Sequence, residues 1–344
     1  MIAPRTGLIL KSIVEEYIAC AVPVPSHTIT ARYGLGVSPA TVRHEMVHLE
    51  GEGYIVRPHH SAGSIPLDKG YRYYVAQLRA SELPLDEQHL ISHLFYQVRA
   101  ELEEWLNLAV TVAAQLTRNF AVATLPKSPD CRFKHTELIS LDNTRALVVL
   151  VLQGAKVRQK LLNLADASSQ VRLTAIASKL NQAFSGLTCT QMQEKKASLA
   201  SMEQEVTGTL VQMMQAEDER DYGQPYLDGL HRLLEQPEFT EGRRVLSLME
   251  LVEERRLLPT IVPPDLRNPG VEVIIGRENR AEAIWDYSVV ISRYGLPEAV
   301  GIIMVIGPTR MPYAHTMAAV SYLASVLSRL AAELYGKPPH DNRN

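Results

Sequence analysis

Two histidines and a glutamate near the N-terminus have the spacing of a zinc-hydrolase motif. His44, Glu45 and His48 form H-E-x-x-H, in which imidazoles one helical turn apart bind zinc and the glutamate activates a water molecule. Such a site also needs a closed cleft and a third ligand, and Asp68 is the only downstream acid at a suggestive spacing. We expect neither a metal cofactor nor hydrolysis here, because a second pattern accounts for the same residues.

The second pattern is an amphipathic helix that begins at Ser38. Ser38 is a suitable N-cap, and Pro39 occupies the first helical position, where its missing N–H costs nothing. Val42, Met46 and Leu49 recur at i, i+4 and i+7 and should face a core. Both histidines then point to solvent, on a polar and moderately basic face suited to the major groove of DNA. The residues expected on this face or its flank are Ala40, Thr41, Arg43, His44, Val47 and His48.

Two patterns upstream supply the rest of a helix-turn-helix. An apolar stripe over residues 10–18 follows the i, i+3, i+4, i+7 spacing of a helix, which Pro23 and Pro25 end. A second helix is expected over Ser26–Arg32, with the serine as its N-cap. Gly34 is suited to end that helix in the left-handed conformation.

The segment after the third helix has the pattern of a β-wing. Tyr54–Arg57 is typical of a strand, and Ile65–Pro66 is typical of the strand that returns beside it. Residues 58–64 between them are typical of a turn, in which Gly63 is free to take positive φ. A basic and aromatic helix start follows at residues 71–75. An ordinary solvated hairpin would have the same pattern, but its place after a helix-turn-helix favours a wing. The cations expected to contact DNA phosphates are Arg57, His60, Lys69 and Arg72.

These motifs are similar to those of the HrcA family, the bacterial heat-inducible transcription repressors. Residues 40–75 match the family pattern in order. That pattern is A-T-I-R-N-E-M, followed by L-E, by G-Y and by H-x-S-A-G-R-x-P-T-x-x-G-Y-R-x-Y-V. Later matches are YLDGLHRLLEQPEF at 226–239, IGREN at 275–279 and GIIMVIGPTRMPY at 301–313. The resemblance therefore covers nearly the whole chain.

The resemblance implies a fold, a function and partners. The implied fold is multidomain α+β: an N-terminal winged helix-turn-helix and a GAF-like domain interrupted by an inserted dimerising domain. The implied function is repression of chaperone operons by a homodimer on an inverted-repeat operator called CIRCE. The implied modulator is the GroEL chaperonin, whose scarcity leaves the repressor inactive.

The chain departs from the family pattern where DNA would be read. Ser64 replaces the wing arginine, Leu67 the threonine that follows it, and His44 the asparagine of the third helix. Pro312 replaces an acid in the late motif. The first three departures bear on operator sequence and affinity rather than on the fold.

Composition agrees with a cytoplasmic regulator. Residues 1–80 carry eight Lys/Arg against six Asp/Glu, whereas the remainder carries 27 against 32. This local basic excess is small but fits a DNA-binding module on an acidic body. The three cysteines are widely spaced, which favours a reducing compartment. We expect no signal peptide and no membrane span, because the longest apolar runs are too short.

The remainder of the chain alternates between helical and strand patterns. We expect a linker at 81–86, a long helical stretch at about 87–119, and strands at 137–141, 145–152 and 156–162. Further strands at 271–275, 289–293 and 300–306 precede a closing helix at 314–334. The expected domains are a winged helix at 1–85, a GAF-like domain at 86–165 and 263–344, and an inserted dimerising domain at 166–262.

The expected insertion contains an apolar stripe with a seven-residue period. Met192, Leu199, Val206 and Met213 lie seven apart, with Met202 nearby. Such a stripe is typical of a coiled-coil contact, so Met192, Leu199, Met202 and Val206 are candidates for dimerisation. A helix packed inside its own monomer would have the same spacing, and the two alternatives stay open.

We interpret the chain as a homodimeric repressor rather than an enzyme. Ser38, Ala40, Thr41, Arg43 and His44 are expected at the DNA, with Thr41, Arg43 and His44 at base edges. One alternative is a repressor that senses a small molecule through its GAF-like domain; another is an enzyme carrying a DNA-binding domain. Residues 301–309 lack the lysine and the spacing of a phosphate-binding loop, and Arg310 either caps that turn or lines a site.

Overall fold

The computed structural model describes most of the chain as a mixed α+β protein. The described residues are 2–34, 36–59, 62–78, 82–98, 101–127, 131–153, 157–196, 199–220, 224–239, 243–263, 266, 270–297 and 299–334. The chain divides into two units. The first comprises residues 1–126, 224–296 and 300–344, and the second comprises 127–223 and 297–299.

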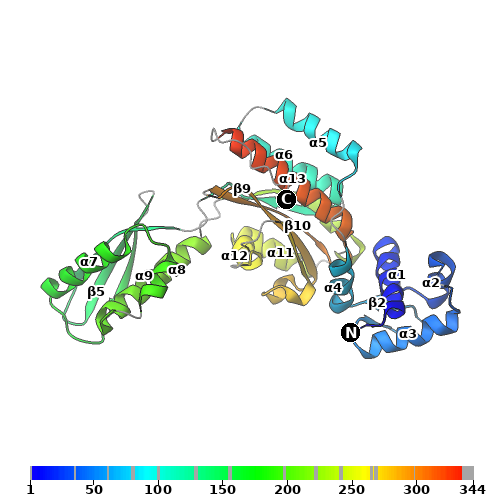
Figure 1. The fold of residues 1–344 in the computed structure, drawn as a ribbon, viewed down its shortest axis with the longest axis horizontal. Helices are drawn as coiled ribbons and strands as arrows, with labels where there is room; N and C mark the ends of the chain where they lie inside the picture. The colour runs from blue at the N-terminus through cyan, green and yellow to red at the C-terminus, as the bar shows by residue number, and fades with distance from the viewer. Residues whose placement is uncertain are drawn as a thin grey trace. The chain divides into compact units, whose positions relative to one another are not determined.

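The N-terminal elements of the first unit follow the predicted order (Figure 1). The inward positions Val42, Met46 and Leu49 are all buried, as their spacing predicted. Helix α1 also buries Leu10 and Ile13. The elements are α1 (Pro4–Cys20), α2 (Ser26–Tyr33), α3 (Pro39–Gly51), β1 (Ile55–Val56), β2 (Ile65–Pro66) and α4 (Asp68–Gln77), with β1 and β2 antiparallel.

Two local predictions in this region need correction. Ser26 is the first residue of α2 and not its N-cap, because Pro25 holds that position in an extended conformation. Gly63 is not among the glycines with positive φ in the described residues. It is required for a different reason: a Cβ at Gly63 would lie 2.4 Å from the carbonyl carbon of Val24, because the wing packs against the α1–α2 connection.

The body of the first unit is an antiparallel sheet covered by helices on both faces (Figure 1). Among the described residues its strand order is β7-β3-β10-β9-β8. Strands β9 and β10 are buried along nearly their whole length, because helices cover both of their sides. The strands are β3 (Phe120–Ala123), β7 (Tyr226–Asp228), β8 (Val271–Ile275), β9 (Tyr287–Leu296) and β10 (Ala299–Pro308).

The helices of this body differ from the prediction in one place. The helical stretch expected over 87–119 is two helices, α5 and α6, because Val98 and Glu101 are both extended. The closing helix α13 is long and apolar enough, by length and composition, to cross a membrane, but it packs against β9 and α6 as a core helix does. The helices are α5 (Leu85–Gln97), α6 (Leu102–Thr117), α10 (Leu230–Leu234), α11 (Arg243–Glu253), α12 (Leu257–Ile261) and α13 (Tyr313–Leu334), with short 3₁₀ turns at Pro237–Phe239, Gly276–Glu278 and Glu282–Ile284.

The second unit is an antiparallel sheet with helices on one face. Its strand order in the described residues is β4-β5-β6, and a turn that contains Asp142 and Asn143 joins β4 to β5. Alternate residues of β4 and β5, including Leu138, Val148 and Leu150, form a core with the helices. The elements are β4 (Phe133–Ser140), β5 (Arg145–Leu152), β6 (Val157–Asn163), α7 (Gln170–Phe184), α8 (Cys189–Lys196) and α9 (Ser201–Arg220).

The domain boundaries expected at 166 and 262 are displaced in the structure. Strands β4, β5 and β6 pair with one another and not with the body sheet, so the insertion begins near residue 127. Strand β7 pairs with β3 of the body, so the insertion ends near residue 223. The predicted boundaries followed changes in local pattern, whereas strand pairing is decided by partners far away in the sequence.

The heptad stripe is packed inside the second unit. Met192 and Val206 are fully buried, Met202 is 7% exposed, and Leu199 is half-buried against the same cluster. These side chains fill the core between helices α8 and α9 and the sheet, which is the second of the two alternatives that the spacing left open. The assignment of this stripe to a dimer contact is therefore corrected.

Candidate nucleic-acid interface

The candidate interface is the outward face of helix α3. The hydroxyl of Ser38 accepts a hydrogen bond from the backbone N–H of Thr41 at 3.1 Å, which fixes the start of the helix as the sequence predicted. Arg43, His44 and His48 are exposed, and 49% of Val47 is exposed. Ala40 is also exposed and Thr41 is half-buried, so the set expected on this face lies there or on its flank.

Two ion pairs hold α3 among its neighbours, and a third joins α1 to α2. Arg5 and Thr6 of α1 donate to the carboxylate of Glu45 at 2.6 and 2.7 Å. At the far end of α3, Glu50 accepts from Arg57 of the wing at 2.7 Å. Helices α1 and α2 are joined by Glu16 and Arg32 at 2.6 Å. No local pattern in the sequence reveals these contacts, and the only local signal is a glutamate beside the inward-facing Met46.

The position of Glu45 is incompatible with the zinc-hydrolase motif. Glu45 is 7% exposed and its carboxylate is bound by α1, whereas His44 and His48 are exposed. In that motif both histidines bind the zinc ion, and the glutamate has to reach the water molecule that the zinc holds. Among the described residues, no three His, Cys, Asp or Glu side chains gather as metal ligands do.

Glu45 is expected to make the stability of the chain depend on acidity. Hydrogen bonds from Thr6 and Arg5 lower the pKa of Glu45 below its ordinary value. Its contribution is therefore present above that ordinary pKa and is lost as pH falls through the lower, folded-state pKa. Glu45→Gln should cost about 1 kcal/mol near neutral pH, since Arg5 is largely exposed, and the difference from wild type should shrink below about pH 4. Urea unfolding at several pH values measures this; a difference independent of pH would contradict the role of the charge.

Arg43 differs from the other cations of the N-terminal elements. Within the described part of residues 2–78, it is the one lysine or arginine with no hydrogen bond or ion pair to the chain. An unpaired, exposed guanidinium keeps its five donors available for a ligand. Such a group on the outward face of a capped helix can donate in bidentate fashion to the edge of a guanine.

The predicted phosphate contacts have different surroundings. The Lys69 ammonium is exposed, donates to the carbonyl of Glu52 at 2.8 Å and lies 4.1 Å from the centre of the Tyr54 ring. The guanidinium of Arg57 is paired with Glu50. His60 lies outside the described residues.

The two departures from the family pattern in and after the wing, Ser64 and Leu67, differ in exposure. Ser64 is fully buried where its backbone pairs with Val24, so this departure does not lie on the surface. Leu67 is 39% exposed.

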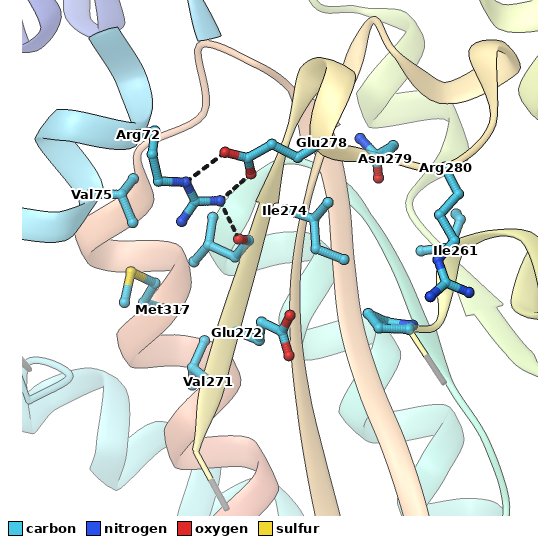
Figure 2. Close-up of a pocket in the computed structure, with 12 residues that line it drawn as sticks. Arg72, Val75, Ile261, Val271, Glu272, Ile274, Glu278, Asn279, Arg280 and Met317 are labelled. Atoms are coloured by element: carbon cyan, nitrogen blue, oxygen red, sulfur yellow. Dashed lines mark hydrogen bonds and ion pairs between the residues drawn. The ribbon is translucent and has the colours of Figure 1, made fainter. Parts of the chain in front are cut away.

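Arg72 contacts another part of the chain. Figure 2 shows its guanidinium directed at the carboxylate of Glu278. The same guanidinium also donates to the carbonyl of Val273 on strand β8. These contacts lie beside a pocket of about 530 Å³. Its lining combines apolar side chains such as Val75, Val271 and Met317 with the charged groups of Arg72, Glu272, Glu278 and Arg280.

Comparisons with known proteins agree over nearly the whole chain. A family model described as the HrcA protein C terminal domain matches residues 103–317. A protein of Dehalococcoides mccartyi named heat-inducible transcription repressor HrcA is 52% identical over 340 residues, which cover 98% of this chain and 99% of that protein. A protein of the same name from Roseiflexus castenholzii is 41% identical over 341 residues, covering 96% and 95%.

A solved structure also shares the fold. A crystal structure of a hypothetical protein matches with a TM-score of 0.61 at 23% identity, covering 97% of this chain and 99% of that one.

Proposed function

The chain belongs to the HrcA family of heat-inducible transcription repressors, and from this premise we propose that it represses chaperone operons as a homodimer on an inverted-repeat, CIRCE-type operator. The observation that carries the proposal is the unpaired Arg43 on the outward face of α3. Heat-inducible transcription repressors are regulators of transcription and not enzymes.

In this proposal α1 to α4 and the hairpin β1–β2 are a winged helix-turn-helix with α3 in the major groove. Arg43 donates to a guanine, while Thr41 and His44 contact neighbouring base edges. Ser38 and Ala40 lie at the start of the helix, where backbone N–H groups approach a phosphate. Histidine at position 44, in place of the family's asparagine, would change the base preference at one position.

The wing and its flank supply the phosphate contacts. Lys69 is proposed for this role because its ammonium is exposed and, among the described residues, is bound only to a backbone carbonyl and an aromatic ring. Arg57 and His60 are proposed for the same role, although Glu50 offsets the charge of Arg57. Arg72 is reassigned to a contact within the chain, since its guanidinium is bound to Glu278 and Val273.

Dimerisation is proposed through the outward face of the sheet β4-β5-β6. In an antiparallel sheet with one covered face, the other face is normally polar. Here the register aligns Ile139, Leu147 and Leu161 in one row across the three strands, and Val151 and Val157 in another. Leu161 is 61% exposed and Val157 is 53% exposed. A second copy can cover these rows through the same face, as two-fold symmetry requires.

The body is proposed to be a GAF-like domain and the second unit its inserted dimerising domain. The GroEL chaperonin is proposed as the partner that keeps the repressor active, and the cytoplasm as the compartment. These assignments follow from membership of the family. A repressor that senses a small molecule is the second candidate, and the pocket beside Arg72 is the observation that favours it.

Selection of bound duplexes from a random pool tests the proposal. The purified full-length chain is expected to enrich an inverted repeat, because a two-fold dimer presents two copies of α3. The enriched repeat should also occur upstream of chaperone genes in the source genome. Enrichment of a single unrepeated site would contradict a dimeric mode of binding.

A further inference from the structure

Helix α4 is joined to the body by contacts between segments about 200 positions apart. Arg72 donates to Glu278 at 2.7 Å and to the carbonyl of Val273 at 2.6 Å. The carboxylate of Asp68 accepts from the backbone N–H of Arg277 at 2.9 Å. Glu278 also accepts from the N–H of Ile275 at 2.8 Å, so the ion pair caps two outward backbone groups of the edge strand β8 (Figure 2).

A second contact joins helix α1 to the body. Arg310, which follows strand β10, donates to the carbonyl of Ile18 near the end of α1 at 3.0 Å. The same guanidinium is paired with Glu238 and bonded to Gln236 at 3.0 Å. The side chain of Arg310 is 13% exposed. It therefore links α1 to a 3₁₀ turn of the body, which is neither of the two roles that its sequence position left open.

The space between these two contacts is closely packed. The rings of Tyr71 and Tyr313 lie 6.0 Å apart and both are buried. The hydroxyl of Tyr313 is bonded to Ser288 at 2.8 Å and donates to the carbonyl of Thr309 at 2.7 Å. A Cβ at Gly276 would lie 2.3 Å from the Asp68 carboxylate, so glycine is required for this approach. The junction has little freedom to change its angle.

We propose that Arg72 and Arg310 are positioning residues that fix the angle of the winged helix on the body and so set the half-site separation that the dimer accepts. Neither residue is assigned a contact with DNA. The inference rests on the proposed dimeric mode of binding. Two α3 helices held rigidly on one dimer match one separation of half-sites, whereas loosely held helices match several and bind the best one less tightly.

The test measures affinity of the full-length protein for duplexes whose two half-sites are moved apart or together by one to five base pairs. Wild-type protein is expected to prefer one separation. Arg72→Gln should lose about tenfold in affinity at that separation and little at the others, which flattens the profile. Arg72→Lys should retain part of the preference, and Glu278→Gln should flatten the profile without adding to the effect of Arg72→Gln.

Arg280→Gln is the matched control, since Arg280 is an exposed arginine of the same pocket with the same loss of charge. It is expected to keep the wild-type profile. An unchanged profile for Arg72→Gln, or an equal loss at every separation, would overturn the inference while leaving the proposed function intact. A wild-type protein without a preferred separation would overturn the dimeric mode of binding and the inference with it. Single half-site affinity and light scattering verify that each variant is folded and dimeric.

Discussion

The substitution Leu161→Glu is expected to dissociate the dimer and to lower operator affinity by about 100-fold or more. Leu161 lies on the outward face of β6, opposite Leu147 of β5, and 61% of it is exposed within its own chain. A carboxylate in an apolar contact between two copies has no partner and loses its hydration. A monomer then binds one half-site without the gain that linkage to the second provides, which is typically 10²–10⁴-fold.

Light scattering and operator titration measure the two effects separately. Val171→Glu is the matched control, because Val171 is 81% exposed on helix α7 of the same unit. The control should remain dimeric with wild-type affinity. Val171→Glu should unfold at the wild-type urea concentration, because Val171 is not buried within the chain. Leu161→Glu should unfold cooperatively at a lower concentration, because a dissociated chain loses the stabilisation that association provides. A Leu161→Glu variant that stays dimeric would place the contact on another surface.

Leu161 could not be identified as a dimer contact from the sequence. The seven-residue stripe pointed to Val206 instead, and the same glutamate there would enter the core of the second unit, because Val206 is fully buried. Periodicity identifies an apolar face but not what covers it. The outward face of the sheet emerged only when the register placed Ile139, Leu147 and Leu161 in one row.

The local features of the N-terminal region were predictable because short-range physics determines them. The spacing of Val42, Met46 and Leu49 predicted the buried side of α3, and Ser38 with Pro39 predicted its start. The same spacing then placed Arg43 and His44 outside. These inferences use only the geometry of one helix.

Features that depend on distant partners were not predictable. Glu45 pairs with Arg5, 40 positions away, and Arg72 pairs with Glu278, 206 positions away. Arg72 follows the wing and is basic, which is typical of a phosphate contact, but no local pattern reveals that a carboxylate of the body binds it. The domain boundary near residue 127 was missed for the same reason, because β4 and β5 have the same local pattern as strands of the body.

Arg43→Ala is expected to lower affinity for the preferred operator by about 1–3 kcal/mol, or roughly 5- to 150-fold, and affinity for random duplex much less. A bidentate contact to guanine exists only at the correct base pair, so its removal costs specific binding more than non-specific binding. Because Arg43 is exposed and makes no hydrogen bond or ion pair with the described residues, the variant should unfold at the wild-type urea concentration. Titrations on the operator, on random DNA and on an operator changed at single guanines measure these quantities.

Lys69→Ala is the control that separates base reading from phosphate binding. A phosphate contact contributes equally on every sequence, so this variant should weaken binding to all duplexes alike and reduce the dependence of affinity on salt by about one counterion. Equal losses for Arg43→Ala on operator and random DNA would instead make Arg43 a phosphate contact. On an operator in which the guanine contacted by Arg43 is replaced, Arg43→Ala should bind no more weakly than wild type. The contact is already missing from that operator, so removing the arginine costs nothing more. Arg43 points outward and has no partner among the described residues, so operator choice should depend on it more than on any other cation of this surface.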